Sequence, residues 1–299
     1  MNRPARSSFS ERDELTTVIK IKYRPLVAAL CLFLCIAVLC SAATGRFSPK
    51  RAGTKSGQLP IILYHIISPN RTRYGITPGE FESDLSYLSK NGYTTITMTD
   101  LIEHVNFGKK LPEKPVILSF DDGYFNNYVY AFPLLKKYHA KMVFSIIGKS
   151  TDDFTAHPSN NLNYSHVTWT QLNEMIQCGL VEVQNHTYHL HEIRNGRIGC
   201  MQKKNESFQE YEKSLSDDLN RLQSEMAKKT GKIPNTFVYP YGKSSKNTDV
   251  ILKKLGFQAT LSCRYGINRI PETPDELFEL CRMERSHGKS LKNMLKRTE

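Results

Sequence analysis

The sequence predicts an α/β domain of parallel strands and crossover helices behind an N-terminal transmembrane helix. Short apolar runs alternate with helical patterns from about residue 59 onward, and polar clusters follow several of those runs. A βα rhythm of this kind produces parallel strands with helical connections. A third observation, the uncharged apolar run at 25–43, is long enough to cross a bilayer.

Length and composition indicate one large globular domain. The 299 residues are 39% hydrophobic and 23% charged, which is ordinary for a folded chain. The net charge of +12 favours anionic partners such as an envelope polymer. Nucleic acid is not expected, because neither zinc-finger spacing nor an RNA-binding aromatic signature accompanies the charge. The cysteines show no CxxC spacing, so the sequence predicts no particular disulfide.

Basic residues before the apolar run set its orientation. Lys20, Lys22 and Arg24 precede the run directly. Because basic flanks stay inside, residues 1–24 are expected in the cytoplasm and 25–43 as a signal anchor. The following domain is then extracellular, on a single-pass protein of the cell membrane.

Small residues near the end of the run leave signal cleavage and secretion open as the alternative. Ser41 and Ala43 have the spacing of a processing site. The Gly-, Ser- and Lys-containing stretch 44–58 lacks apolar periodicity and is expected to be a linker. The exported domain is therefore expected at 59–299.

Each element of the domain is expected from its own pattern. Apolar and β-branched runs predict strands at 60–67, 94–98, 116–120, 142–147, 181–185, 236–240, 257–262 and near 277–283. Apolar residues at three- and four-residue spacing, or helical length between strands, predict helices after Thr77-Pro78 and at 124–139, 207–229 and 247–255.

The first polar cluster is Asp121-Asp122, which follows the run 116–120 directly and precedes a glycine. Asp-Gly is also a common turn, and an aspartate can cap a following helix. The functional alternative divides the work between the two carboxylates. One binds a metal, and the other acts as general base toward water.

The second cluster, Asn185 to His191, follows the strand predicted at 181–185 and holds three histidines. Two histidines and one carboxylate form a catalytic type of metal site, which leaves positions for water and substrate. A pair of structural histidines is the alternative, since histidines often only form hydrogen bonds.

Together, the two clusters resemble the polysaccharide deacetylase family, which is NodB-like and also called carbohydrate esterase family 4. The stretch 119–123, SFDDG, matches the motif of that family closely. The resemblance implies a distorted (β/α) barrel of about seven parallel strands. It also implies Asp121 as general base and Asp122 and His186 as ligands of a divalent metal. Zinc is the default, and cobalt, nickel or manganese also suit such ligands.

The histidine spacing departs from the usual pattern of the family. The family has HxxxH, whereas His186 and His191 form HxxxxH in this chain. The longer spacing resembles the subgroup that includes biofilm poly-N-acetylglucosamine deacetylases. We therefore expect His191 as the second histidine ligand, with His189 as the alternative.

Other positions match the family less fully. Tyr239-Pro-Tyr241-Gly resembles a groove-wall motif in which a tyrosine backbone N–H, here that of Tyr241, holds the oxyanion. Val238 stands where the family has an arginine, and the fourth family motif has no counterpart. His65 is expected to contact substrate because it ends a strand. His287 is the candidate general acid that protonates the leaving amine.

The resemblance implies hydrolysis of acetamide groups on N-acetylglucosamine-type residues of a cell-wall or extracellular polysaccharide, with release of acetate. The missing arginine and fourth motif favour one alternative, a protein that keeps the fold but only binds glycan. Metal-dependent hydrolysis of phosphate esters is another alternative.

Overall fold

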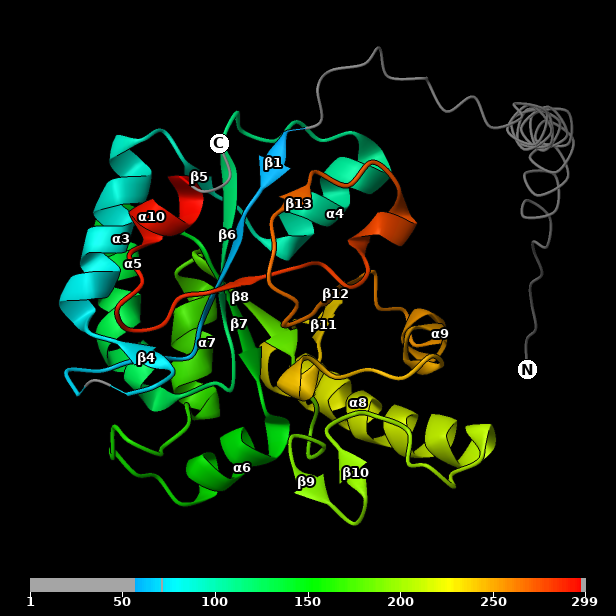
Figure 1. Cartoon of the computed structure of the whole chain (residues 1–299). Coiled ribbons are helices and arrows are strands. Elements are labelled where there is room, and N and C mark those ends of the chain that lie inside the picture. Colours follow the sequence, from blue (N-terminus) through cyan, green and yellow to red (C-terminus); the bar gives the residue numbers. More distant parts are fainter. Residues whose placement is uncertain (1–56, 71, 297–299) are drawn as a thin grey trace, which may run out of the picture. The chain divides into compact units, whose positions relative to one another are not determined.

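The computed structural model describes residues 57–70 and 72–296 (Figure 1). The predicted segment 1–24, the predicted membrane helix 25–43 and nearly all of the predicted linker 44–58 lie outside the described residues. No helix within the described part is long and apolar enough to cross a membrane.

Seven parallel strands form one strongly curled sheet (Figure 1). Six of them follow one another in chain order, and the last strand of the chain pairs with the first of these six. The order is β12-β11-β8-β7-β6-β2-β14, and a short strand, β5 (Thr94–Thr95), pairs in addition with β6. This half-barrel confirms the predicted α/β class. Its strands are β2 (Ile61–Tyr64), β6 (Pro115–Phe120), β7 (Met142–Ile146), β8 (Val181–Asn185), β11 (Thr236–Val238), β12 (Ala259–Leu261) and β14 (Met283–Glu284).

Residues 280–285, which we call the closing segment, connect the two edges of this sheet. At its start, the N–H of Leu280 donates to the carbonyl of Thr260 at 3.0 Å, beside β12. At its end, β14 pairs with β2, and the N–H of Arg285 donates to the carbonyl of Leu63 at 2.8 Å. The closing segment therefore brings residues from late in the chain beside the first long strand.

Helices connect the strands and cover the outside of the sheet (Figure 1). They are α3 (Pro78–Lys90), α4 (Met98–Phe107), α5 (Phe132–Tyr138), α6 (Gly148–Ala156), α7 (Trp169–Gln177), α8 (Phe208–Thr230), α9 (Thr248–Lys254) and α10 (Leu291–Lys296). Short helical turns are η1 (Asn127–Ala131), η2 (Pro240–Gly242) and η3 (Pro274–Leu277). Two-residue strands pair outside the sheet: β1 (Gln58–Leu59) with β13 (Asn268–Arg269), β3 (Ile66–Ile67) with β4 (Gly75–Ile76), and β9 (Ile193–Arg194) with β10 (Arg197–Ile198).

Alternate residues of the strands enter two different hydrophobic clusters. Ile61 and Ile117 pack in the cluster that includes residues of α4. Ile62 and Leu118 pack in the cluster that includes residues of α3, α5 and α7. Side chains along a strand point alternately to opposite faces. Because both faces are covered, the strands consist of apolar runs, which is why they could be recognised in the sequence.

One predicted strand ends earlier than expected. The strand expected at 94–98 is only β5, because a helix begins at Met98. Thr97 and Asp100 form a capping box in which each side chain accepts a hydrogen bond from the other residue's backbone N–H, at 3.1 and 3.0 Å. This cap determines the local structure, although the apolar residues around it also fit a strand.

The predicted helices are present with modified bounds. Helix α8 matches the prediction at 207–229, and α9 matches 247–255. The helix predicted at 124–139 is split into the π-helical turn η1 and the helix α5. The strand predicted near 277–283 is short, and η3 occupies residues just before it.

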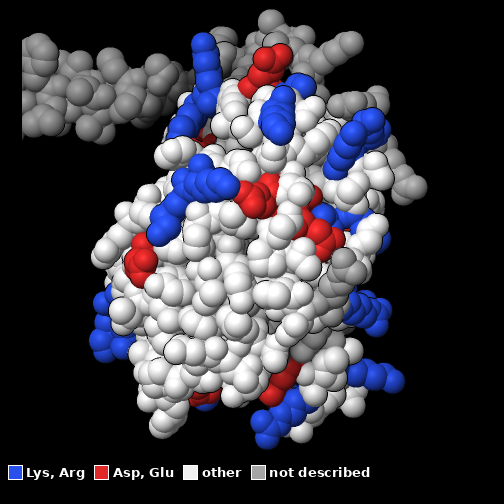
Figure 2. Space-filling model, turned by 90° about the vertical axis from the view of Figure 1, so that its left-hand side faces the viewer, with Lys and Arg blue, Asp and Glu red and all other residues white. Residues whose placement is uncertain are grey.

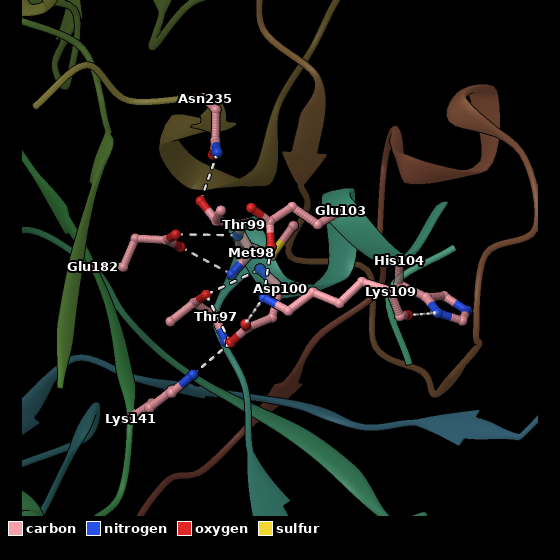
Figure 3. A network of polar contacts seen from close by, with 10 residues as sticks. All are labelled: Thr97, Met98, Thr99, Asp100, Glu103, His104, Lys109, Lys141, Glu182 and Asn235. Atoms are coloured by element: carbon pink, nitrogen blue, oxygen red, sulfur yellow. Dashed lines mark hydrogen bonds and ion pairs between the residues drawn. The ribbon is translucent and has the colours of Figure 1, made fainter. Parts of the chain in front are cut away.

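A polar network ties the start of α4 to the sheet (Figure 3). The carboxylate of Glu182 in β8 accepts hydrogen bonds from the first two N–H groups of α4, at 2.9 and 3.1 Å. Lys141, before β7, donates to Asp100 at 2.7 Å, and Asn235, before β11, donates to Thr99 at 2.8 Å. These partners lie at the amino-terminal ends of the strands, so the network fastens α4 across that end of the sheet.

Replacing Glu182 by glutamine should destabilise the domain. The substitution removes a charge from a helix N-terminus and one of two acceptors, so the free energy of unfolding should fall by about 1–2 kcal/mol. Urea unfolding followed by circular dichroism measures this change. Glu103→Gln is the control, because Glu103 pairs with Lys109 on the surface and should contribute less than about 0.5 kcal/mol. Equal unfolding midpoints for Glu182→Gln and the unmodified chain would contradict the role of this cap.

Candidate metal centre

A cavity of about 560 Å³ opens at the carboxyl ends of the strands. It is lined by residues that follow β2, β6, β8 and β11, together with residues of the closing segment. Active sites of parallel α/β folds lie at this end of the sheet. The structure thus collects here six of the seven residues predicted from the sequence: His65, Asp121, Asp122, His186, His191 and Tyr241.

The chain turns sharply where three of these strands end. Asp122, Thr187 and Tyr241 have φ angles of 71°, 76° and 59°, in the left-handed region that residues with a side chain seldom adopt. Threonine is especially unfavourable there because it is β-branched. Such strain persists only where the surrounding structure enforces it, and it is concentrated at functional sites.

Asp122, His186 and His191 form a group that fits a divalent metal. One ligand atom from each lies within 4.8 Å of the others. The Nε2 atoms of His186 and His191 are 3.5 and 3.3 Å from Asp122 Oδ1. That oxygen is buried and accepts no close hydrogen bond from the described residues. A buried carboxylate oxygen between two imidazole nitrogens lacks a partner, and a cation would supply one.

A backbone carbonyl fixes the tautomer of His186. Its Nδ1 lies 2.8 Å from the carbonyl oxygen of Val238, at the end of β11. Because a carbonyl only accepts, Nδ1 carries a hydrogen, and Nε2 is the ring atom that faces Asp122. Histidine ligands of metals are commonly oriented by a hydrogen bond of this kind.

Electrostatics within the group favour an ionised Asp122 and a neutral His191. Burial disfavours the charge of Asp122, but His186 and His191 outweigh it and lower the pKa of the carboxyl. Burial, followed by the neighbouring His186, lowers the pKa of His191 to about 4. Burial also opposes the charged form of His186, but both aspartates outweigh it and raise its pKa. A carboxylate and a neutral imidazole are the forms that bind metals.

Asp121, beside this group, pairs with an arginine that the sequence analysis did not assign. Arg282 donates from Nη1 to Asp121 Oδ1 at 2.8 Å, and the two side chains are 0% and 2% exposed. Burial disfavours the charged carboxylate, but the guanidinium and the nearby His186 outweigh it and lower the pKa of Asp121. The closing segment therefore supplies an arginine to the predicted base, although Val238 occupies the position of the family's arginine.

The loop between the two histidine ligands is held by α8. The Asp218 carboxylate accepts hydrogen bonds from the backbone N–H groups of Tyr188 and His189, both at 2.8 Å. Both residues lie inside the HxxxxH stretch, so Asp218 determines how this stretch folds. His189 itself does not line the cavity, whereas His191 does. The sequence analysis predicted this helix at 207–229 but assigned no role to Asp218.

Two further predicted residues form part of the cavity wall. His65 lies just beyond β2, and its Nδ1 is buried without a hydrogen-bond partner among the described residues. Asn127 in η1 donates to the backbone carbonyl of His65 at 2.8 Å. Tyr241 packs its ring against His191, with 4.7 Å between centroids.

The structure does not place His287 in the cavity. Its Nδ1 lies 3.3 Å from Glu80 Oε1, and the residue does not line the site. The chain turns toward α3 after the closing segment, where Arg285 forms a buried ion pair with Asp84 at 2.8 Å. This turn carries His287 outward, so the structure does not bring the predicted general acid together with the other six residues.

Comparisons with known proteins identify the family of this chain. The family model for polysaccharide deacetylases matches residues 108–260. The Bacillus subtilis (strain 168) protein YxkH is 30% identical over 212 residues, covering 71% of this chain and 67% of the relative. A poly-beta-1,6-N-acetyl-D-glucosamine N-deacetylase of Escherichia coli (strain K12) is 28% identical over 200 residues. That match covers 61% of this chain but only 30% of the E. coli protein.

Solved structures give the same result. A de-N-acetylase from Aggregatibacter actinomycetemcomitans superposes with a TM-score of 0.69 at 26% identity, covering 80% of this chain and 100% of that one. IcaB from Ammonifex degensii gives a TM-score of 0.68 at 27% identity, covering 80% and 96%. The fold, the cavity and the matched family model together show that this chain belongs to the polysaccharide deacetylase family.

Proposed function

We propose that this chain is a metal-dependent N-deacetylase of polysaccharides with N-acetylglucosamine-type residues, and that it releases acetate. One observation carries the proposal: Asp122, His186 and His191 converge on one point beside the buried pair of Asp121 and Arg282. A metal site next to an ionised base suits hydrolysis of an unactivated amide. Several relatives are named for deacetylation of poly-beta-1,6-N-acetyl-D-glucosamine, which supports a substrate of that class.

The residues of the chain divide the work of the reaction. When bound, a divalent ion at Asp122, His186 and His191 supplies Lewis acidity toward the acetamide carbonyl and water. Asp121 takes the proton of the attacking water and is held ionised and in place by Arg282. The backbone N–H of Tyr241 stabilises negative charge on the acyl oxygen, and one such donor typically contributes about 3 kcal/mol.

His65 takes the place of His287 as the donor of a proton to the leaving amine. It lines the cavity, and its buried Nδ1 has no partner among the described residues. Carbon–nitrogen cleavage leaves an amine that needs a proton, and histidine is the residue that most often supplies one. The water is thereby divided between acetate and amine, so the atoms of the reaction balance.

Zinc is the metal we propose, because two imidazoles and one carboxylate suit it, although cobalt, nickel and manganese also accept this ligand set. We assign the chain to the subgroup with HxxxxH spacing, since His191 rather than His189 reaches the site. We further propose that residues 25–43 anchor the protein in the cell membrane with the domain outside.

Asp121→Asn tests the reaction itself. The amide cannot accept the proton of the attacking water, so acetate release from N-acetylglucosamine oligomers should fall about 100- to 10,000-fold. Metal content, measured by atomic absorption, should stay unchanged because the ligands are intact. Asp122→Asn should instead lose the metal as well. Turnover by Asp121→Asn equal to that of the unmodified chain would refute the assignment.

Arg282→Met tests the pairing that maintains the base in its ionised form. Without the guanidinium, burial raises the pKa of Asp121, so the base is ionised only at higher pH. The acid limb of the pH profile of kcat/KM should move upward, with a loss of about 100-fold at pH 6 and partial recovery toward pH 8. Arg282→Lys keeps the positive charge and should shift the limb less. Thermal melting identifies variants that fail to fold. If Arg282→Met folds and the acid limb of its kcat/KM profile does not move, Arg282 does not keep Asp121 ionised.

Asp218→Asn tests the support of the metal ligands. In this variant, a side-chain NH₂ group replaces one of the two oxygens that accept from the backbone N–H groups of Tyr188 and His189. The HxxxxH loop therefore loses one of these two hydrogen bonds. The metal affinity should weaken by about tenfold, measured by chelator competition. The neighbouring Asp217→Asn is the matched control, because Asp217 pairs on the surface with Lys213. Equal metal affinities for the two variants would show that the loop does not depend on Asp218.

A further inference from the structure

Two segments beside the cavity contain no Lys, Arg, Asp or Glu, although 23% of the chain is charged. They are residues 124–135 and 154–173. They pack on each other: the N–H of Phe125 donates to the carbonyl of Ser165 at 2.8 Å, and Tyr124 forms a bridge with His166. The two segments thus form one continuous uncharged unit, which reaches the cavity through Tyr124.

Figure 2 shows where charged side chains lie on one face of the domain. It views the side of the domain on which α3 and α5 lie in Figure 1. Charged side chains gather in the upper half of this face and along its margins, and the centre of the lower half is uncharged (Figure 2). Charged side chains are therefore not spread evenly over this face.

Four aromatic side chains form a row that leads outward from the cavity. Tyr124 lines the cavity and contacts the ring of His166 at 4.9 Å between centroids. His166 contacts Phe154 at 5.6 Å, and Phe154 contacts Tyr164 at 6.4 Å. The first three rings are partly exposed, and Tyr164, at the outer end, is 58% exposed. The row therefore runs from the cavity to the surface of the domain.

Amide side chains accompany the outer end of this row. Asn160, Asn161 and Asn163 are all exposed next to Tyr164 in the chain. Amides can both donate to and accept from hydroxyl and acetamide groups. Aromatic rings offer flat apolar faces with large contact areas. Such a surface fits a ligand whose rings have apolar faces and whose edges carry uncharged polar groups.

We propose that this aromatic row and its asparagines bind an uncharged, N-acetylated glycan strand that extends from the residue in the cavity. The inference rests on the proposed function, and it defines the substrate more narrowly as a long strand that remains acetylated next to the reacting residue. An anionic polymer would gain nothing from this surface, despite the positive charge of the chain. Binding here should also depend little on ionic strength, because no formal charge takes part.

Tyr164→Ala in the full-length chain tests the proposal. With chitooligosaccharides as probes, KM should rise by about 3- to 10-fold for a hexamer, the effect of losing one aromatic contact, and much less for a dimer. Raising the salt concentration from 50 to 300 mM should leave the ratio of the KM of Tyr164→Ala to the KM of the unmodified chain the same. Phe107→Ala is the matched control, because Phe107 is 82% exposed and lies at the end of α4, far from the row in the fold. It should give the same KM as the unmodified chain at every length.

A KM effect of Tyr164→Ala that is equal for dimer and hexamer would overturn the proposal, and so would no effect at all. Calorimetry of hexamer binding distinguishes a failure of the aromatic row from a failure of the proposed function, because it measures binding without turnover. If the unmodified chain released no acetate but bound hexamer more tightly than Tyr164→Ala, the row would stand and the deacetylase assignment would fall. If the unmodified chain and Tyr164→Ala bound the hexamer with equal affinity, the proposal that the row binds glycan would be refuted, whether or not the chain releases acetate.

Discussion

The buried ion pair between Arg282 and Asp121 connects the curvature of the sheet with the chemistry of the cavity. A guanidinium without exposure to solvent needs a charged partner. The closing segment carries a second buried arginine, Arg285, which pairs with Asp84 of α3 at 2.8 Å. One arginine thus points to the site and the other to the helical layer. Such pairs add little net stability, but together they fix the segment that joins the two edges of the sheet.

Around this pair, strained strand ends position the other groups. Asp122 and Thr187 occupy left-handed backbone at the ends of β6 and β8, and the carbonyl of Val238 in β11 orients His186. Three strands therefore contribute to one point in space, and none of the ligands depends on a long mobile side chain. The proposed acetamide hydrolysis would take place at the edge of a rigid sheet, which suits a reaction that needs defined spacing of metal ligands and base.

The parts of the site that sequence could predict are those that follow directly from strand ends. Asp121, Asp122 and His186 come immediately after apolar runs, and parallel strands bring their carboxyl ends together. The roles of Arg282 and Asp218 were not predictable in this way, because they depend on which segment closes the sheet and on which turn of α8 faces the histidine loop. The position of His287 outside the cavity was not predictable either, because residue type alone does not show where the chain turns after β14. The start of α4 was missed because a four-residue cap outweighed an apolar pattern that also suits a strand.

The closing segment also has a consequence for the order of assembly. Arg282 and Asp121 are separated by 161 positions in the chain. Contacts of such long range form late, since the entropy of closing a long loop opposes them. During synthesis, every other strand of the sheet leaves the ribosome before the arginine does. A nascent chain can therefore bring Asp122, His186 and His191 together while Asp121 still lacks its charged partner, and the cavity is completed only when the last strand docks.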